Sequence, residues 1–180
     1  MSGRLIAVVG PSGVGKDSVM AGMVARIPAL RLVRRTITRP PELGGEDYKY
    51  LAPQTFADAA ARGAFALHWD AHGLSYGIPA KALTNVQAGH SCLANLSRGV
   101  LVQAARVFPS LIVLHITAHP EVLAARLAAR GRETGDDIAS RLRQADKPLP
   151  EGLVVVTIEN NGTLEAAIEA ACAAIQPVSV

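Results

Sequence analysis

The residues Gly10-Pro11-Ser12-Gly13-Val14-Gly15-Lys16 have the glycine spacing and the terminal lysine of a phosphate-binding loop. Glycine allows the tight turns that point successive backbone N–H groups at one anion, and the lysine adds a point charge near the β- and γ-phosphates of a nucleotide. An apolar run precedes the motif and a helical pattern follows it, which is the context it requires. The predicted chemistry is phosphoryl transfer from ATP; the alternative is an ordinary glycine-rich turn.

The residue after Lys16 departs from the usual pattern of such loops. A Ser or Thr hydroxyl normally ligates Mg²⁺ there, whereas this chain has Asp17 followed by Ser18. Either Asp17 contacts the ion or its waters, or Ser18 takes over the role. The alternative is that Asp17 only stabilises the positive end of the helix. We expect Mg²⁺ as a cofactor, with Asp17 or Ser18 as its contact.

Arginine is concentrated in two segments of a chain whose formal net charge is only +3. The first cluster contains Arg31, Arg34, Arg35 and Arg39, and the second contains Arg126, Arg130, Arg132, Arg141 and Arg143. The planar guanidinium binds phosphate through two hydrogen bonds, so the clusters predict a polyanionic ligand held from two sides. Solvated helix faces are the alternative. Nucleic acid is not expected, because aromatic residues make up only 4% and are not interleaved with the basic ones.

Short apolar runs predict the strands that position these residues. Residues 5–9 form such a run, which ends at Gly10 and is typical of a strand buried on both faces. A helix should follow at about 15–27, stopped by Pro28. Similar strands are predicted at 91–94, 111–116 and 153–158, each followed by a helical pattern. This alternation predicts an α/β fold of three layers, with a mainly parallel sheet between helices.

Two segments interrupt the alternation. Residues from about 31 to 78 mix β-favouring pieces, turns and a helix near 54–62, and we interpret them as an inserted substrate-binding subdomain. Residues from about 126 to 143 contain two helical patterns joined around Gly131, with a further glycine at Gly135, and are predicted to form a lid that closes over the nucleotide. Both belong to one predicted domain, 1–180.

The composition limits the class of protein. No apolar run approaches the ~20 residues of a membrane span, and the N-terminus lacks the pattern of a secretory signal, so a soluble cytoplasmic protein is expected. Cys92 and Cys172 lie far apart in apolar surroundings and are predicted to be buried free thiols rather than a disulfide or metal ligands. We expect a monomer or a homodimer.

Several segments outside the loop resemble the guanylate kinase family, over nearly the whole chain. They are Thr38-Arg39, Gly45-Glu46-Asp47-Tyr48, His72-Gly73-Leu74-Ser75-Tyr76-Gly77-Ile78-Pro79, Arg126-Leu127, Arg130-Gly131-Arg132-Glu133, Arg141 and Asn160-Asn161. The resemblance implies a P-loop kinase fold, and together with the chemistry of the loop and of the arginines it leads us to expect roles in three groups. Phosphoryl transfer is assigned to Lys16, Arg39, Arg130 and Arg141. ATP binding is assigned to Gly10, Pro11, Ser12, Gly13, Val14, Gly15, Lys16, Asp17, Ser18, Arg126, Arg130 and Asn161. Substrate binding is assigned to Arg35, Arg39, Tyr48, Tyr76, Arg98 and Arg132.

The departures from that family concern base recognition. Leu67 is interpreted as standing where guanylate kinases carry a guanine-reading glutamate, and the strand at 91–94 leads into Asn95 and Arg98 instead of acidic residues. These changes, with Lys16-Asp17-Ser18, resemble the ribose 1,5-bisphosphate phosphokinase family of phosphonate breakdown. That resemblance implies ATP-dependent phosphorylation of a phosphorylated sugar, ribose 1,5-bisphosphate, to 5-phosphoribosyl 1-diphosphate (PRPP). The alternatives are a guanylate kinase converting GMP to GDP and a non-enzymatic guanylate kinase-like interaction module.

Overall fold

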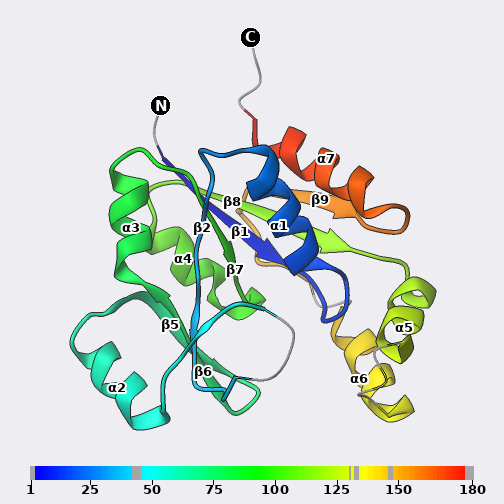
Figure 1. Ribbon diagram of the computed structural model, residues 1–180, viewed down its shortest axis with the longest axis horizontal. Coiled ribbons are helices and arrows are strands. Elements are labelled where there is room, and N and C mark those ends of the chain that lie inside the picture. The colour runs from blue at the N-terminus through cyan, green and yellow to red at the C-terminus, as the bar shows by residue number, and fades with distance from the viewer. Residues whose placement is uncertain (1–2, 42–45, 130, 132–133, 146–147, 177–180) are drawn as a thin grey trace.

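The computed structural model describes residues 3–41, 46–129, 131, 134–145 and 148–176. Its main sheet has five strands in the order β2-β7-β1-β8-β9, and every neighbouring pair is parallel. The strands are β1 (Leu5–Val9), β2 (Arg31–Leu32), β7 (Cys92–Asn95), β8 (Leu111–Thr117) and β9 (Val155–Glu159). The predicted α/β fold with a mainly parallel sheet is therefore confirmed (Figure 1).

Both faces of the main sheet are covered, which produces three layers. Along β1 the side chains alternate: Ile6 and Val8 belong to one apolar cluster, whereas Leu5, Ala7 and Val9 belong to the other. The first cluster lies under α1 (Lys16–Arg26), α5 (Pro120–Ala129) and α7 (Leu164–Ile175). The second lies under α3 (Ala80–Gln87), η1 (Arg98–Val100) and α4 (Leu101–Val107). A strand buried on both faces has no polar side, which explains its continuous apolar run.

A second, smaller sheet has the strand order β4-β3-β6-β5. Its strands are β3 (Thr36–Ile37), β4 (Lys49–Tyr50), β5 (Phe65–Ala71) and β6 (Leu74–Pro79), and the helix α2 (Pro53–Ala61) lies between β4 and β5 in sequence. Strands β5 and β6 form an antiparallel hairpin. Its turn consists of His72 and Gly73, with φ angles of 53° and 73°, a left-handed conformation that suits a two-residue hairpin turn.

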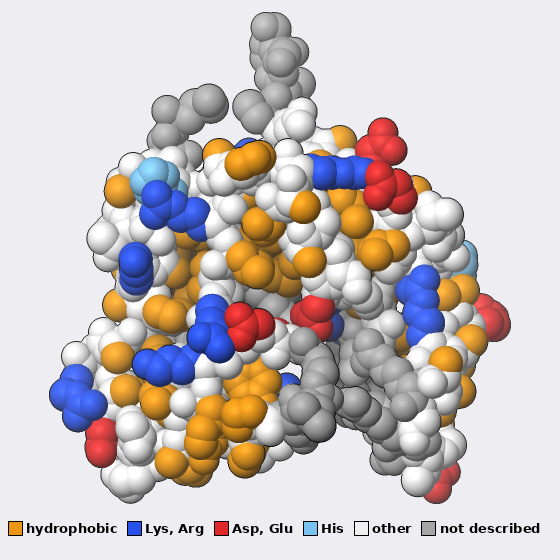
Figure 2. Space-filling model, in the orientation of Figure 1, with side chains coloured by type: hydrophobic (Ala, Val, Ile, Leu, Met, Phe, Trp, Pro, Cys, Tyr) orange, Lys and Arg blue, Asp and Glu red, His pale blue; other side chains and the backbone are white. Residues whose placement is uncertain are grey.

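Helices α5 and α6 (Gly135–Ala145) pack against each other on the opposite side of the molecule from the second sheet. Figure 2 shows that this face is hollowed between the second sheet and the α5–α6 pair. The carboxyl ends of β1, β7, β8 and β9 lead into this region, where ligands bind to open parallel sheets.

Element boundaries differ from the sequence prediction in places that have a physical reason. The first helix begins at Lys16 rather than at residue 15, because Gly15 has a left-handed backbone (φ 95°) and serves as the N-cap. The last predicted strand begins at Val155 rather than residue 153, and Val154 is 63% exposed because β9 is an edge strand.

Cys92 and Cys172 are buried free thiols, as predicted. Among the described residues, none of the helices has the length and apolar character needed to span a bilayer.

Candidate active site

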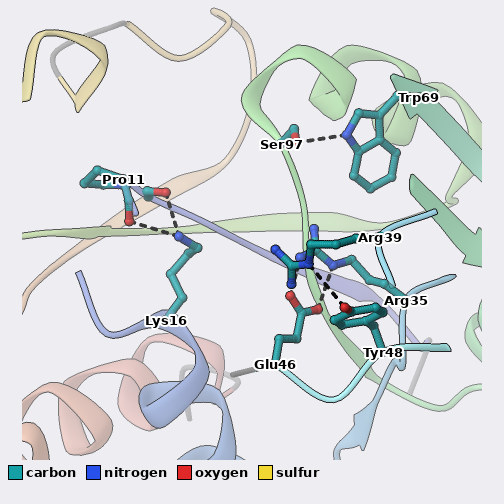
Figure 3. Close-up of polar contacts among 9 residues, drawn as sticks. Pro11, Lys16, Arg35, Arg39, Glu46, Tyr48, Trp69 and Ser97 are labelled. Carbon is teal, nitrogen blue, oxygen red and sulfur yellow. Dashed lines mark hydrogen bonds and ion pairs between the residues drawn. The ribbon is translucent and has the colours of Figure 1, made fainter. Parts of the chain in front are cut away.

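The phosphate-binding loop connects the end of β1 to the start of α1. Gly13 and Gly15 have φ angles of 85° and 95°, which L side chains rarely adopt. A Cβ on Gly13 would also lie 2.7 Å from Leu127 Cδ2 of α5, so a larger residue would have to displace this leucine as well as strain the backbone. The Lys16 ammonium folds over the loop and donates hydrogen bonds to the carbonyls of Gly10 (2.8 Å) and Pro11 (3.0 Å), as Figure 3 shows. The amine is thus held beside the backbone that would cradle phosphate.

Side chains that lie more than 100 residues later in the sequence form hydrogen bonds with the backbone of this loop. Asn160 is 4% exposed and its Nδ2 donates to the Val14 carbonyl at 2.9 Å. The predicted ATP-binding Arg126 reaches the same carbonyl through Nη1 at 3.4 Å. The predicted Asn161 accepts a hydrogen bond from the His119 backbone N–H (2.6 Å) and so ties the connection after β8 to the connection after β9. Asn160 was not predicted as a site residue, although the segment Asn160-Asn161 is one of those that resemble the guanylate kinase family.

A cavity of about 320 Å³ opens beside the loop and contains the predicted metal contacts. Its lining residues are Ser12, Gly13, Gly15, Lys16, Asp17, Ser18 and Asn95. Asp17 and Ser18 are exposed in the first turn of α1, whereas Asn95, at the end of β7, is 8% exposed. Sequence reasoning treated the end of this strand only as a place that had lost acids and missed the Asn95 amide that lines the cavity.

The donor set of the cavity fits Mg²⁺ held mainly by phosphate oxygens. One carboxylate, two hydroxyls and one amide supply the hard oxygen ligands that this ion prefers. Within the described ranges there is no group of three or more His, Cys, Asp or Glu side chains that would form a complete protein cage. Mg²⁺ at phosphate-transfer sites usually needs only one or two carboxylates in addition to the substrate phosphates.

The predicted substrate residues Arg39 and Tyr48 contact each other on the other side of the hollow. Arg39 Nε donates to the Tyr48 hydroxyl (3.2 Å), and the guanidinium carbon lies 4.9 Å from the centre of the Tyr48 ring. The Tyr48 hydroxyl donates to the Pro40 carbonyl at 2.9 Å. A hydrogen bond from Tyr48 to a substrate phosphate would therefore have to replace the bond to Pro40.

The predicted substrate residue Arg35 is paired within the protein. It is 8% exposed, and its Nε and Nη2 atoms donate to the two oxygens of Glu46, the first at 2.7 Å. Its guanidinium carbon also lies 5.3 Å from the centre of the Tyr76 ring. Two of the donor nitrogens of Arg35 are thus directed at Glu46. Sequence reasoning did not assign a role to Glu46, because nothing local in the sequence pairs it with Arg35.

Tyr76 belongs to an aromatic pair that links the two sheets. The Trp69 and Tyr76 rings stack with centroids 5.5 Å apart and an interplanar angle of 10°. Trp69 Nε1 donates to the hydroxyl of Ser97 (2.9 Å), a residue that follows β7 of the main sheet.

The predicted substrate residue Arg98 follows Ser97 in the sequence, and its Nη2 lies 3.3 Å from His115 Nε2 on β8. Burial, and secondarily the Arg98 charge, lower the pKa of His115, which favours a neutral ring that accepts from Arg98.

The structure places Leu67 in the apolar core. Its side chain is fully buried and lies opposite Ile78, so it offers no hydrogen-bond acceptor to a base. The pairing register shifts between Phe65 and Leu67. The residue directly before Trp69 is His68, whose side chain is exposed. The interpretation that Leu67 replaces a base-reading carboxylate stays a prediction.

Three predicted lid residues cannot be placed. Arg130 and Arg132 lie outside the described residues, and so does the Arg141 side chain, although its backbone belongs to α6. Their roles stay predictions.

A parallel sheet with a phosphate-binding loop after its first strand, a second small sheet and a helical pair beyond the strand ends together define a P-loop kinase. The sequence model of the guanylate kinase family matches residues 2–176, and the chain belongs to that family. The chain is 52% identical to "Ribose 1,5-bisphosphate phosphokinase PhnN" of Ruegeria sp. (strain TM1040), over 97% of this chain and 92% of that protein. It is 44% identical to the protein of the same name from Azotobacter vinelandii, over 94% of each chain. The crystal structure of guanylate kinase from Anaplasma phagocytophilum has the same fold, with a TM-score of 0.65 at 17% identity, over 95% of this chain and 82% of that one.

Proposed function

We propose that this chain is an ATP-dependent kinase that phosphorylates the 1-phosphate of ribose 1,5-bisphosphate and produces PRPP, a reaction of phosphonate breakdown. The observation that carries the proposal is the 52% identity, over nearly the full length of both chains, to a protein named ribose 1,5-bisphosphate phosphokinase. The phosphate-binding loop and its lysine support it, because a non-enzymatic interaction module would have no need of them.

The chemistry of this reaction fits the residues that line the site. The nucleophile is an oxygen of the 1-phosphate, which is already anionic, so the protein needs no general base. A new bond forms between this oxygen and the γ-phosphorus, while the bond from that phosphorus to the β,γ-bridging oxygen breaks and ADP leaves with the electron pair. Catalysis then consists of positioning and of neutralising negative charge. Mg²⁺ bound at Asp17 or Ser18 would supply part of that positive charge.

The protein groups divide between the two sides of the hollow. The loop with Lys16 would hold the ATP phosphates, and residues 126–143 would close over them as a lid. Residues 31–78, which contain most of the second sheet, would bind the sugar phosphate, with Arg39 as the phosphate contact. Arg98 follows β7 of the main sheet, directly after the Ser97 hydroxyl that Trp69 of the second sheet contacts. The cytoplasmic location and the oligomeric state, a monomer or a homodimer, remain predictions from the sequence.

The test of the proposal is a direct competition of acceptors. With ATP and Mg²⁺, the purified protein should convert ribose 1,5-bisphosphate to a diphosphate sugar, identified by phosphorus NMR and by ADP release. GMP should be at least about 100-fold poorer in kcat/KM, because unmet hydrogen bonds to a base are strongly penalised. Efficient formation of GDP without a diphosphate sugar would instead identify a guanylate kinase. Absence of ADP release with every phosphorylated acceptor would favour the interaction module.

Arg39 provides a prediction on the substrate side. Arg39→Ala should lower kcat/KM for the sugar bisphosphate by at least about tenfold, because a charge-assisted phosphate contact contributes ~1.5–3 kcal/mol. The matched control is Arg34→Ala in the same segment, whose side chain is 58% exposed and pairs with Asp47 on the surface. We expect this control to retain the wild-type kcat/KM. Equal kcat/KM values for both variants would remove Arg39 from the substrate site.

A further inference from the structure

Glu46 carries a negative charge next to the arginines that are proposed to bind the acceptor, which itself carries two phosphate groups. Its side chain is only 18% exposed, and both of its oxygens accept hydrogen bonds from Arg35. Figure 3 shows it beside the guanidinium groups of Arg35 and Arg39. An acidic side chain repels phosphate, so its presence beside two arginines needs an explanation other than phosphate binding.

Arg35 lies on the face of the second sheet that turns toward the main sheet. In the antiparallel register Ile37 pairs with Tyr76, and Tyr76 pairs with Trp69. Side chains two residues apart on a strand share a face, so Arg35 projects on the same side as Ile37. The contact of Arg35 with the Tyr76 ring agrees with this placement. The Arg35–Glu46 pair therefore borders the aromatic pair that leads to Ser97 of the main sheet.

Stability alone does not account for this ion pair. Burying two charges costs solvation, and an apolar pair of similar shape stabilises a fold equally well or better. The neighbouring Arg34–Asp47 pair shows the ordinary alternative, since its side chains are 58% and 78% exposed. What the two-bond contact from Arg35 does provide is a fixed orientation of the Glu46 carboxylate.

The remaining hydrogen-bonding capacity of Glu46 indicates what it would bind. An ionised carboxylate offers about four lone-pair sites and no donor, and Arg35 uses one site on each oxygen. The groups that complement the other sites are hydroxyl donors. Phosphate groups do not complement these sites, because phosphate oxygens are acceptors themselves. Arg39, which lies beside Glu46, can donate to a phosphate instead. The pair of side chains thus matches a hydroxyl next to a phosphate, which is a feature of a sugar phosphate.

We propose that Glu46 is a specificity-determining residue that accepts hydrogen bonds from the sugar hydroxyls of the acceptor, with Arg35 as the positioning residue that orients it. This inference rests on the proposed sugar-phosphate kinase activity and adds to it the group that recognises the sugar.

The experiment compares the acceptor with its deoxy analogues. kcat/KM is measured for ribose 1,5-bisphosphate and for its 2-deoxy and 3-deoxy forms, with the wild type, Glu46→Gln and the matched control Asp47→Asn. The wild type and the control should both prefer ribose 1,5-bisphosphate over at least one deoxy form by about tenfold or more, because the lost hydrogen bond involves a charged group. In Glu46→Gln this preference should fall to about two- or threefold. The ratio is independent of the folded fraction, so a partly unstable variant still reports on recognition.

A second variant tests whether Glu46 is only the counter-ion of Arg35. The double change Arg35→Met with Glu46→Leu removes both charges and keeps the buried volume, so the fold should survive. The sugar preference should be lost in this variant as well.

An active wild type whose preference persists in Glu46→Gln and in the double variant would overturn the role of Glu46 and leave the proposed function intact. So would an active wild type that does not distinguish the deoxy forms. A wild type that phosphorylates GMP but not ribose 1,5-bisphosphate would overturn both.

Discussion

Phosphoryl transfer is expected to fall by about 10²–10³-fold or more when Lys16 is replaced by alanine, because removing one preorganised charge from such a site has an effect of that order. The Lys16 ammonium is held over the loop by the Gly10 and Pro11 carbonyls, at 2.8 and 3.0 Å. From that position it can follow the negative charge that moves between the β- and γ-phosphates during transfer. The backbone N–H groups of the loop supply only partial charges, so they would not make up for the lost ammonium.

The fold should tolerate the change, because the Lys16 amine contacts loop carbonyls rather than the apolar core. The melting temperature of Lys16→Ala should therefore stay within a few degrees of the wild type while ADP release is lost. The matched control is Lys81→Ala, an exposed lysine in the first turn of α3, which should keep wild-type turnover. Wild-type turnover in Lys16→Ala would remove this residue from catalysis, and a large drop in melting temperature would assign it to the fold.

The main sheet could be predicted from the sequence because its signals are local and redundant. The central strand β1 is a continuous apolar run whose five residues are all buried. The edge strand β9 was predicted less accurately, because one side of an edge strand lacks a neighbour and the apolar run extends beyond the paired residues. Leu67 shows a different limit. The irregular pairing near Phe65 is set by contacts between strands, so the direction of each side chain on β5 could not be read from alternation alone.

The site shows the same division between local and distant contacts. The phosphate-binding loop could be predicted because seven consecutive residues form it. The brace from Asn160 to Val14 joins residues 146 positions apart, and the Arg35–Glu46 pair depends on how one loop returns to the second sheet. Such contacts appear only after the strands are assembled. The clustering of arginines in the sequence therefore identified the polar segments. It could not show that Arg35 is paired with Glu46 and so differs from an arginine available to bind phosphate.

Asp17 carries the second prediction with a large expected effect, on the Mg²⁺ requirement. It lies exposed in the first turn of α1 and lines the cavity beside the loop, together with Ser18 and Asn95. Asn95 is neutral, so Asp17 is the one carboxylate among the residues that line this cavity. A hard ion that already binds phosphate oxygens gains most from a nearby carboxylate, whether it is bound directly or through water.

Asp17→Ala should therefore raise the Mg²⁺ concentration for half-maximal rate by about 10–100-fold, the range found when groups around a metal ion are removed. The KM for the sugar should change much less, because the proposed acceptor site lies on the other side of the hollow. Asp17→Ser should recover part of the loss, since it restores the hydroxyl that such loops normally carry. The measurement is initial rate against free Mg²⁺ at saturating ATP and sugar for the three proteins.

The rival explanation makes Asp17 only a stabilising charge at the start of a helix, worth about 0.3–1 kcal/mol. Glu121 provides the control, because it is an exposed acid in the first turn of α5. Glu121→Ala should lower the melting temperature slightly and leave the Mg²⁺ titration unchanged. If Asp17→Ala behaves like Glu121→Ala, with a titration that overlays the wild type, the acid acts on the helix alone, and Ser18 or Asn95 becomes the protein group to test next at the metal. A rightward shift of the titration in Asp17→Ala but not in Glu121→Ala, partly reversed in Asp17→Ser, is the result expected from a role at the ion.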